Sequence, residues 1–227
     1  MISLRARLTS LATVAALAFS LVAVVPATAG STPVRALEAE QYALRLLNCT
    51  RTGGKVTAEG ACVGRGSGRY SAYRKPLRLH KGISNKVAWP WAKALALKDV
   101  CGHTIAGKPS LATRLRNSGF KYPGYGENIG CGKTSSSAKS VVLMAHRMMQ
   151  AEQKSRGGHW KNMKNTQFKS VGISVARVGK RVRVVYEFYG CLLYTSDAAD
   201  DQGRVEGAGG AGGGGWGGGG GGGGGGG

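Results

Sequence analysis

The sequence predicts an α+β sandwich, with helices early in the central region and paired strands at its end. Apolar residues recur at helical spacing in several segments before residue 155, whereas strict alternation occurs only after residue 170. Strands and helices do not alternate regularly along the chain. These observations favour segregated helices and strands over a parallel α/β sheet.

Both ends of the chain are expected to lie outside this domain. Residues 1–29 have the pattern of a secretory signal, with Arg5 and Arg7 before a long apolar run and Ala-Thr-Ala at the expected cleavage site. No second apolar span follows, so we expect an exported protein without a membrane span in its mature form.

The other end is a low-complexity segment. Residues 191–227 begin with Cys-Leu-Leu-Tyr-Thr-Ser and finish in a glycine run that is broken only by two alanines and Trp216. The first part resembles a translated sequencing adapter, and polyglycine is what an unread run of G would encode. We therefore interpret 191–227 as read-through and 30–190 as one domain, while a true flexible tail is the alternative.

The chain is strongly basic, with 32 Lys and Arg against 11 Asp and Glu and a formal net charge of +21. Four of the acidic residues lie in the tail, so the domain carries even more positive charge than the whole chain. Such charge favours an anionic cell-envelope polymer or lipid headgroups as partners, and nucleic acid is not expected outside the cell. A solvated surface that keeps the protein monomeric and soluble explains the same composition.

The domain holds four cysteines, which in an exported protein indicate two disulfides with three possible connectivities. We favour Cys49–Cys62, which closes a short loop, and Cys101–Cys131, which joins the segments beside His103 and Glu127, two candidate residues of a functional site. A cysteine zinc finger is excluded because no Cys-x-x-Cys occurs.

The helices are predicted in order from caps and apolar spacing. Thr32 and Pro33 are a typical helix start, and the following helix is expected to continue to Gly53. A loop rich in Gly, Ser and basic residues follows over 51–74. Further helices are predicted over 84–100, where His103 comes just past the end, and over 111–117.

A longer helix is expected over 138–154. Its predicted apolar stripe contains Val141, Ala145 and Met148, and the next position on that stripe is Glu152. A carboxylate on such a stripe points inward or toward a cleft. His146 falls on nearly the opposite side from Met148 and is left out of the candidate site.

The last predicted unit is a β-hairpin. Apolar residues alternate over 171–175 and again over 182–188, and Gly179-Lys180 supplies the turn between them. This alternation predicts strands with one buried face.

Two histidines and two glutamates lie near glycine-rich turns and are candidates for one site: His103, Glu127, Glu152 and His159. Two imidazoles with carboxylates could bind Zn²⁺ or another divalent ion. The same residues could instead form His–Glu pairs for acid–base chemistry. Each histidine could also simply satisfy a structural hydrogen bond.

Three short motifs resemble the CAP superfamily of cysteine-rich secretory, antigen 5 and pathogenesis-related proteins. Residues 126–129, Gly-Glu-Asn-Ile, resemble its GENI motif, and Gly158-His159-Trp160 resembles its Gly-His-aromatic signature. Leu47-Asn48-x-x-Arg51 resembles the first-helix pattern. After His159, Trp160-Lys161-Asn162 replaces the usual continuation, which makes the chain most similar to bacterial secreted members.

The resemblance implies a three-layer α-β-α sandwich of the CAP/SCP type, with a cleft tetrad of His103, Glu127, Glu152 and His159. It also implies zinc or another divalent cation between His103 and His159. Two functions are compatible with it. The first is a non-enzymatic extracellular module that binds lipid, peptide or envelope polymer. The second is a metal-dependent hydrolase of the peptidase type, with Glu127 or Glu152 as the catalytic base.

Overall fold

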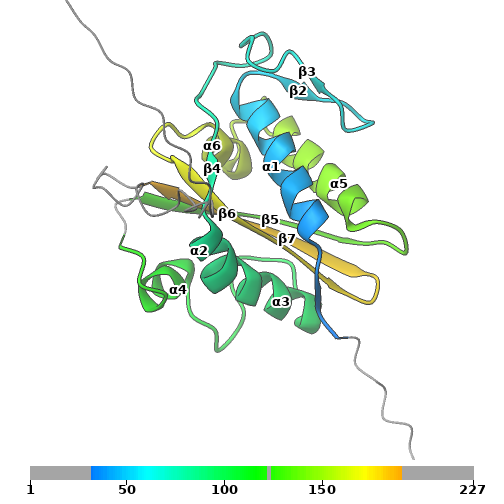
Figure 1. Cartoon of the computed structure of the whole chain (residues 1–227), viewed down its shortest axis with the longest axis vertical. Coiled ribbons are helices and arrows are strands. Elements are labelled where there is room, and N and C mark those ends of the chain that lie inside the picture. The colour runs from blue at the N-terminus through cyan, green and yellow to red at the C-terminus, as the bar shows by residue number, and fades with distance from the viewer. Residues whose placement is uncertain (1–31, 122–123, 191–227) are drawn as a thin grey trace, which may run out of the picture.

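The computed structural model describes residues 32–121 and 124–190 (Figure 1). The predicted signal segment and the glycine tail lie outside these residues. The helices are α1 (Leu37–Arg51), α2 (Lys81–Ile83), a π-helical segment (Ser84–Ala88), α3 (Trp89–Lys98), α4 (Leu111–Asn117), α5 (Ala138–Ala151) and α6 (Gly158–Lys164). The strands are β1 (Val34–Arg35), β2 (Lys55–Val56), β3 (Cys62–Val63), β4 (Arg78–Leu79), β5 (Gly124–Lys133), β6 (Ser170–Val178) and β7 (Arg181–Gly190).

A five-stranded sheet forms the middle layer. The hairpin β6–β7 is its centre, β5 pairs antiparallel with β7, and the short strands β1 and β4 both pair with β6 on the other side. Strand β5 therefore lies at an edge of the sheet. Strands β2 and β3 form a separate two-stranded ribbon.

Helices cover both faces of this sheet. Helices α1, α5 and α6 lie on one face, and α2, α3 and α4 lie on the other (Figure 1). The predicted three-layer α-β-α sandwich is thereby confirmed. Within the described residues, no helix has the length and apolar content needed to cross a membrane.

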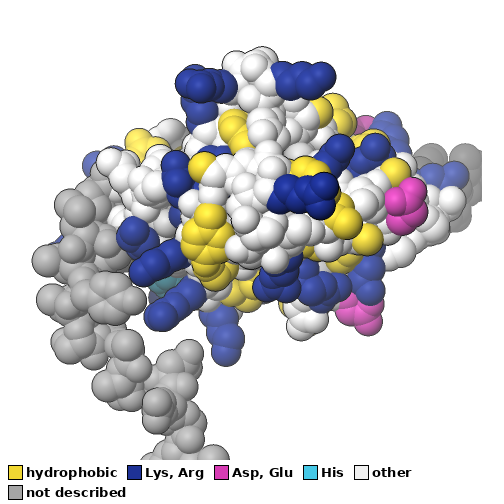
Figure 2. Space-filling view, turned by 90° about the horizontal axis from the view of Figure 1, so that it is seen from above, with side chains coloured by type: hydrophobic (Ala, Val, Ile, Leu, Met, Phe, Trp, Pro, Cys, Tyr) yellow, Lys and Arg dark blue, Asp and Glu magenta, His cyan; other side chains and the backbone are white. Residues whose placement is uncertain are grey.

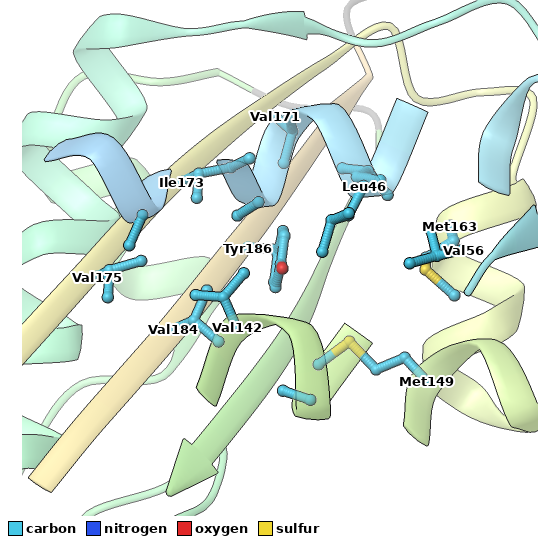
Figure 3. Packing of buried hydrophobic residues seen from close by; sticks show 14 of the residues in the cluster. Leu46, Val56, Val142, Met149, Met163, Val171, Ile173, Val175, Val184 and Tyr186 are labelled. Carbon is cyan, nitrogen blue, oxygen red and sulfur yellow. The ribbon is translucent and has the colours of Figure 1, made fainter. Parts of the chain in front are cut away.

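The two faces of the hairpin belong to different cores. Val171, Ile173 and Tyr186 point toward α1 and α5 (Figure 3), whereas Ala176 and Val185 pack against α3. The prediction of one buried face was wrong, because a sheet covered by helices on both sides buries both sets of alternating residues.

Two local predictions were also wrong. The first helix begins at Leu37, since Val34 and Arg35 pair with β6 and the segment at Pro33 precedes them. The glycine-rich GENI segment is not a turn but part of the ten-residue strand β5, which gains its hydrogen bonds from β7. Helix α6 follows Gly157 and precedes the hairpin, in a segment for which local spacing gave no prediction.

Helix α5 buries Val141 and Ala145 of the predicted stripe, but Met148 is exposed and Met149 is buried in its place. The buried side of the helix contains His146, because α5 packs against α1 as well as the sheet. The argument that placed Glu152 on the stripe of Met148 was therefore wrong, and Glu152 is positioned instead by the end of the helix.

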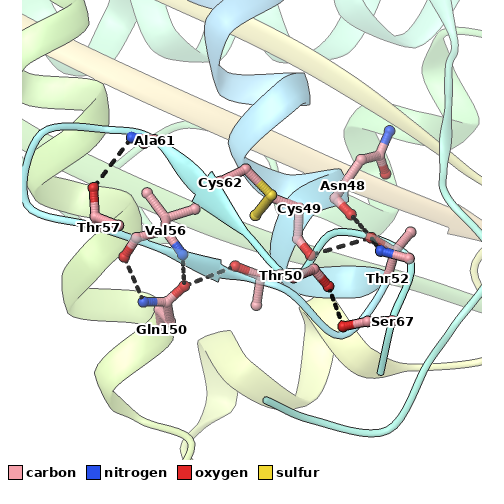
Figure 4. The surroundings of a disulfide bond; sticks show 12 residues. Asn48, Cys49, Thr50, Thr52, Val56, Thr57, Ala61, Cys62, Ser67 and Gln150 are labelled. Carbon is pink, nitrogen blue, oxygen red and sulfur yellow. Dashed lines mark hydrogen bonds between the residues drawn. A yellow bond between two sulfur atoms is a disulfide. The ribbon is translucent and has the colours of Figure 1, made fainter. Parts of the chain in front are cut away.

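Both favoured disulfides are present. Cys49–Cys62 connects the end of α1 to β3, and Cys101–Cys131 connects the segment before His103 to β5. Near the first disulfide, the Gln150 side chain bonds the backbone of Val56 in both directions and accepts from the Thr50 hydroxyl (Figure 4). The ribbon β2–β3 is thereby fixed to α5 as well as α1.

Candidate functional site

The first His–Glu pair connects the α3–α4 segment to the sheet. The Nδ1 atom of His103 lies 2.8 Å from Oε1 of Glu127. Glu127 is buried on β5, while the His103 side chain is 56 % exposed. The Cys101–Cys131 disulfide joins the same two segments a few residues away. The imidazole is therefore held at the surface by a buried carboxylate.

The second pair spans the turn between α5 and α6. Nδ1 of His159 lies 2.5 Å from Oε1 of Glu152, and the backbone N–H groups of His159 and Trp160 donate to Oε2 of the same carboxylate. A Cβ at Gly157 would lie 2.4 Å from Oε2 of Glu152, so this turn requires glycine there. Burial acts to raise the pKa of Glu152, but the bonds from His159 and the two N–H groups outweigh it and lower that pKa.

The two pairs meet beside the edge strand β5. The ring centroids of His103 and His159 are 6.5 Å apart, with the ring planes inclined by 32°. One pair comes from the α3–α4 side of the sheet and the other from the α5–α6 side. Asn128 on β5 donates to the backbone oxygen of His159, and Asn162 donates to the backbone oxygen of Glu127. The structure thus brings all four candidate residues together as two coupled pairs.

Arg114 and Glu187 also belong to this network, although sequence reasoning did not identify them. Arg114 on α4 donates through Nη2 to Oε2 of Glu127 and, at 3.1 Å, to Oε1 of Glu187. Glu127 and Glu187 are directly opposite each other on β5 and β7. The Arg114 guanidinium lies 3.9 Å from the ring centroid of Trp91 and is buried.

Glu187 is fully buried beside this arginine. Burial raises the pKa of Glu187 well above its usual range, and the charge of Glu127 raises it further, against the opposing effect of Arg114. A protonated Glu187 leaves Arg114 to balance the single charge of Glu127. The signal in the sequence was a lone acidic residue inside the apolar run of β7, but its partner could not be known before the pairing of β5 with β7.

The donors at this site fit a divalent ion in part. Because an ionised carboxylate only accepts hydrogen bonds, Nδ1 is the donor in each pair, and Nε2 of a neutral imidazole then keeps a lone pair. Such carboxylate-oriented imidazoles are usual around metals. Within the described ranges, no group of three or more His, Cys, Asp or Glu side chains is arranged to hold a metal.

The residues therefore fit a two-histidine site that water or a ligand must complete. Two imidazoles on one tetrahedral zinc ion have ring centroids roughly 5 Å apart. The observed separation is 6.5 Å, so holding one ion between them requires the exposed His103 ring to move inward.

The structure is similar to two solved structures. One is an extracellular protein containing an SCP domain from Bacillus anthracis str. Ames, with 19 % identity, a TM-score of 0.47, and coverage of 68 % of this chain and 41 % of that one. The other is the crystal structure of NaASP2 with Zn²⁺, with 19 % identity, a TM-score of 0.43, and coverage of 71 % and 82 %. The match therefore spans less than half of the Bacillus protein.

No protein-family model and no curated protein matches the sequence. The α-β-α sandwich is shown by the chain's own sheet and helices, and the chemistry of its site is argued from its own residues.

Proposed function

We propose that the protein is a secreted CAP-domain binding module, in which His103 and His159 offer their outer ring nitrogens to a divalent cation or to a polar group of a lipid, peptide or envelope polymer. The observation that carries this proposal is the full engagement of both glutamates. Glu127 uses one oxygen for His103 and the other for Arg114. Glu152 uses one for the His159 ring and the other for two backbone N–H groups.

This engagement argues against a hydrolase in which Glu127 or Glu152 is the general base. A general base must have a lone pair within reach of the proton that it removes. In this chain both carboxylates orient imidazoles instead, and Glu127 is also balanced by a buried arginine. Their geometry favours holding a ligand at the two Nε2 atoms over activating water at a carboxylate.

Export is supported by observations that are independent of the site. The chain begins with the pattern of a secretory signal, and the domain contains two disulfides, which are typical of oxidising compartments. A bound Zn²⁺ would supply a Lewis-acid centre for a ligand oxygen, and His103 and His159 are the residues that would hold it. Glu127 and Glu152 would fix the tautomer and the direction of each ring.

The test is calorimetric titration of ZnCl₂ into the oxidised protein and into a His103→Ala/His159→Ala double variant. We expect stoichiometric binding that the double variant loses. His80→Asn is the matched control, since it removes a histidine elsewhere and keeps an acceptor at the start of α2. Equal zinc affinity in the double variant would contradict the proposed site.

A hydrolysis assay separates the two function classes. Labelled casein is incubated with the zinc-loaded wild type and with Glu127→Gln. A binding module should show no turnover with either protein. Turnover by the wild type that Glu127→Gln abolishes would replace this proposal with the hydrolase.

A further inference from the structure

A second concave site lies beside α6. It is a cavity of about 660 Å³ between α6, the end of α5 and the segment that leads from β3 to β4. Four basic residues line it, namely Arg74, Arg156, Lys161 and Lys164, and no acidic residue does. None of the four tetrad residues lines it. We call this site the basic cavity.

The basic residues of this cavity have no counter-charge within the described part of the chain. None of the four forms an ion pair there. Nε of Arg74 is buried without a hydrogen-bond partner, and only Nη1 donates, to the backbone oxygen of Tyr73. No acidic side chain pairs with the charge in this cavity among the described residues. The face of the molecule seen in Figure 2 likewise carries many Lys and Arg side chains and few Asp and Glu.

Lys164 is fixed in place as part of the wall. Its ammonium group lies within hydrogen-bond distance of the Thr50, Arg51 and Ala72 backbone oxygens and of the Ser71 hydroxyl. Burial lowers the pKa of Lys164 to about 8, and the charges of Arg74 and Arg51 add to the effect. An anion in the cavity would relieve this repulsion between like charges.

Arg156 shows backbone strain at the same cavity. Its φ is +53°, in the left-handed region that favours glycine, and it is one of only two such non-glycine residues among those described. Two glycines follow it directly, so the chain places an arginine where a glycine would fit with less strain. Retained strain of this kind occurs at functional sites.

An aromatic ring completes the lining. Trp160 is partly buried against the main core, and Nζ of Lys164 lies 5.5 Å from its ring centroid. A tryptophan fixed in this way offers an apolar face beside positive charge. The volume lies within the usual range for sites of small ligands.

We propose that the basic cavity binds an anionic saccharide, with its phosphate or carboxylate group at Arg74 and Arg156 and its sugar ring against Trp160. Guanidinium groups with free N–H donors suit both phosphate and carboxylate oxygens. This site takes a ligand independently of the tetrad, so the His103→Ala/His159→Ala variant keeps it.

The test is calorimetry of the oxidised full chain at low salt with four probes: glucose 6-phosphate, glucuronic acid, inorganic phosphate and glucose. We expect at least one of the two anionic sugars to bind roughly tenfold more tightly than inorganic phosphate, and glucose to bind hardly at all. Absence of binding by both anionic sugars at millimolar concentration overturns the proposal. Equal affinity for inorganic phosphate also overturns it, since the sugar ring would then contribute nothing.

Matched variants locate the ligand. Arg74→Gln/Arg156→Gln is expected to lose roughly tenfold in affinity or more. Arg65→Gln/Lys108→Gln removes the same charge from exposed positions outside the cavity and should bind as the wild type does. Equal losses in the two double variants would show a general effect of net charge and refute the site.

Arg156→Gly guards against misfolding as an explanation. Because glycine relieves the left-handed strain, this variant should keep or raise the melting temperature while it weakens binding. Unchanged affinity in a folded Arg156→Gly protein would remove Arg156 from the site and contradict the proposal.

Discussion

Because His146 is fully buried, we predict that the protein loses stability in mild acid. The residue is fully buried on α5, with Nε2 2.9 Å from the Thr50 hydroxyl. That hydroxyl donates to Gln150, so it accepts from Nε2–H of the neutral ring. Nδ1 has no partner among the described residues, and a proton added there would be a buried donor without an acceptor.

The size of the effect follows from the pKa of His146. Burial lowers this pKa from 6.5 to about 3. A group that binds its proton less readily in the folded state stabilises the protein above its unfolded pKa, and this contribution is lost as the pH falls from 6.5 toward 3. At about 1.4 kcal/mol per pH unit, the loss is about 2 kcal/mol at pH 5 and about 4 kcal/mol once the pH reaches 3.

The assay is urea unfolding, followed by circular dichroism, of the oxidised protein between pH 7.5 and 4.5. His146→Gln should reduce the fall in unfolding free energy by about 2 kcal/mol between pH 7.5 and 5, whatever its stability at pH 7.5. Met148→Gln changes an exposed position on the same helix and should keep the slope of the wild type. Parallel curves for the wild type and His146→Gln would refute the reasoning.

Three further predictions concern the sheet and the site. Gly130→Ala should lower the unfolding free energy by about 1–3 kcal/mol, because its Cβ would lie 2.4 Å from Cβ of Ala145; Gly102→Ala, which meets nothing within 4 Å, should be nearly neutral in the same urea titration. Because the pKa of Glu187 is raised, the wild type should lose stability as the pH rises above the ordinary range for glutamate, and Glu187→Gln should not show this loss. If the unfolding free energies of the two proteins change equally between pH 5 and pH 8, the prediction is contradicted. Replacing Cys101 and Cys131 by serine opens a loop with a sequence separation of 30. The unfolding free energy should fall by about 3–4 kcal/mol, and the affinity for zinc should fall as well. Unchanged zinc affinity in the folded variant would show that the disulfide does not hold the His103 segment in place.

Several features could be predicted from sequence because local spacing specifies them. The hairpin was identified from alternation around Gly179, and helix α4 was predicted with its observed bounds. The favoured disulfide pairing could be chosen because Cys49–Cys62 closes a short loop and Cys101–Cys131 joins the segments beside His103 and Glu127. Glu127 and His159 could be selected because they lie in CAP-like motifs, whereas the apolar-stripe argument that selected Glu152 was wrong.

Other features depend on partners far away in sequence. The glycines of the GENI segment carry no apolar alternation, so β5 becomes a strand only through its pairing with β7. Which side of α5 is buried is decided by α1 and the sheet together, and periodicity alone selected Met148 over Met149. The exposed or buried state of a residue is a property of the layer that covers it.

The sequence by itself determined the α+β class and the presence of an even number of cysteines suited to two disulfides, because these depend on residue type and short-range spacing. Only the tertiary structure decided that Glu127 on β5 lies opposite Glu187 on the neighbouring strand β7, and that Arg114 donates to both carboxylates. It also decided that basic residues from three separate segments surround one cavity. Such clusters form when distant segments pack against each other, and side-chain charge and pKa then depend on neighbours that no local pattern specifies.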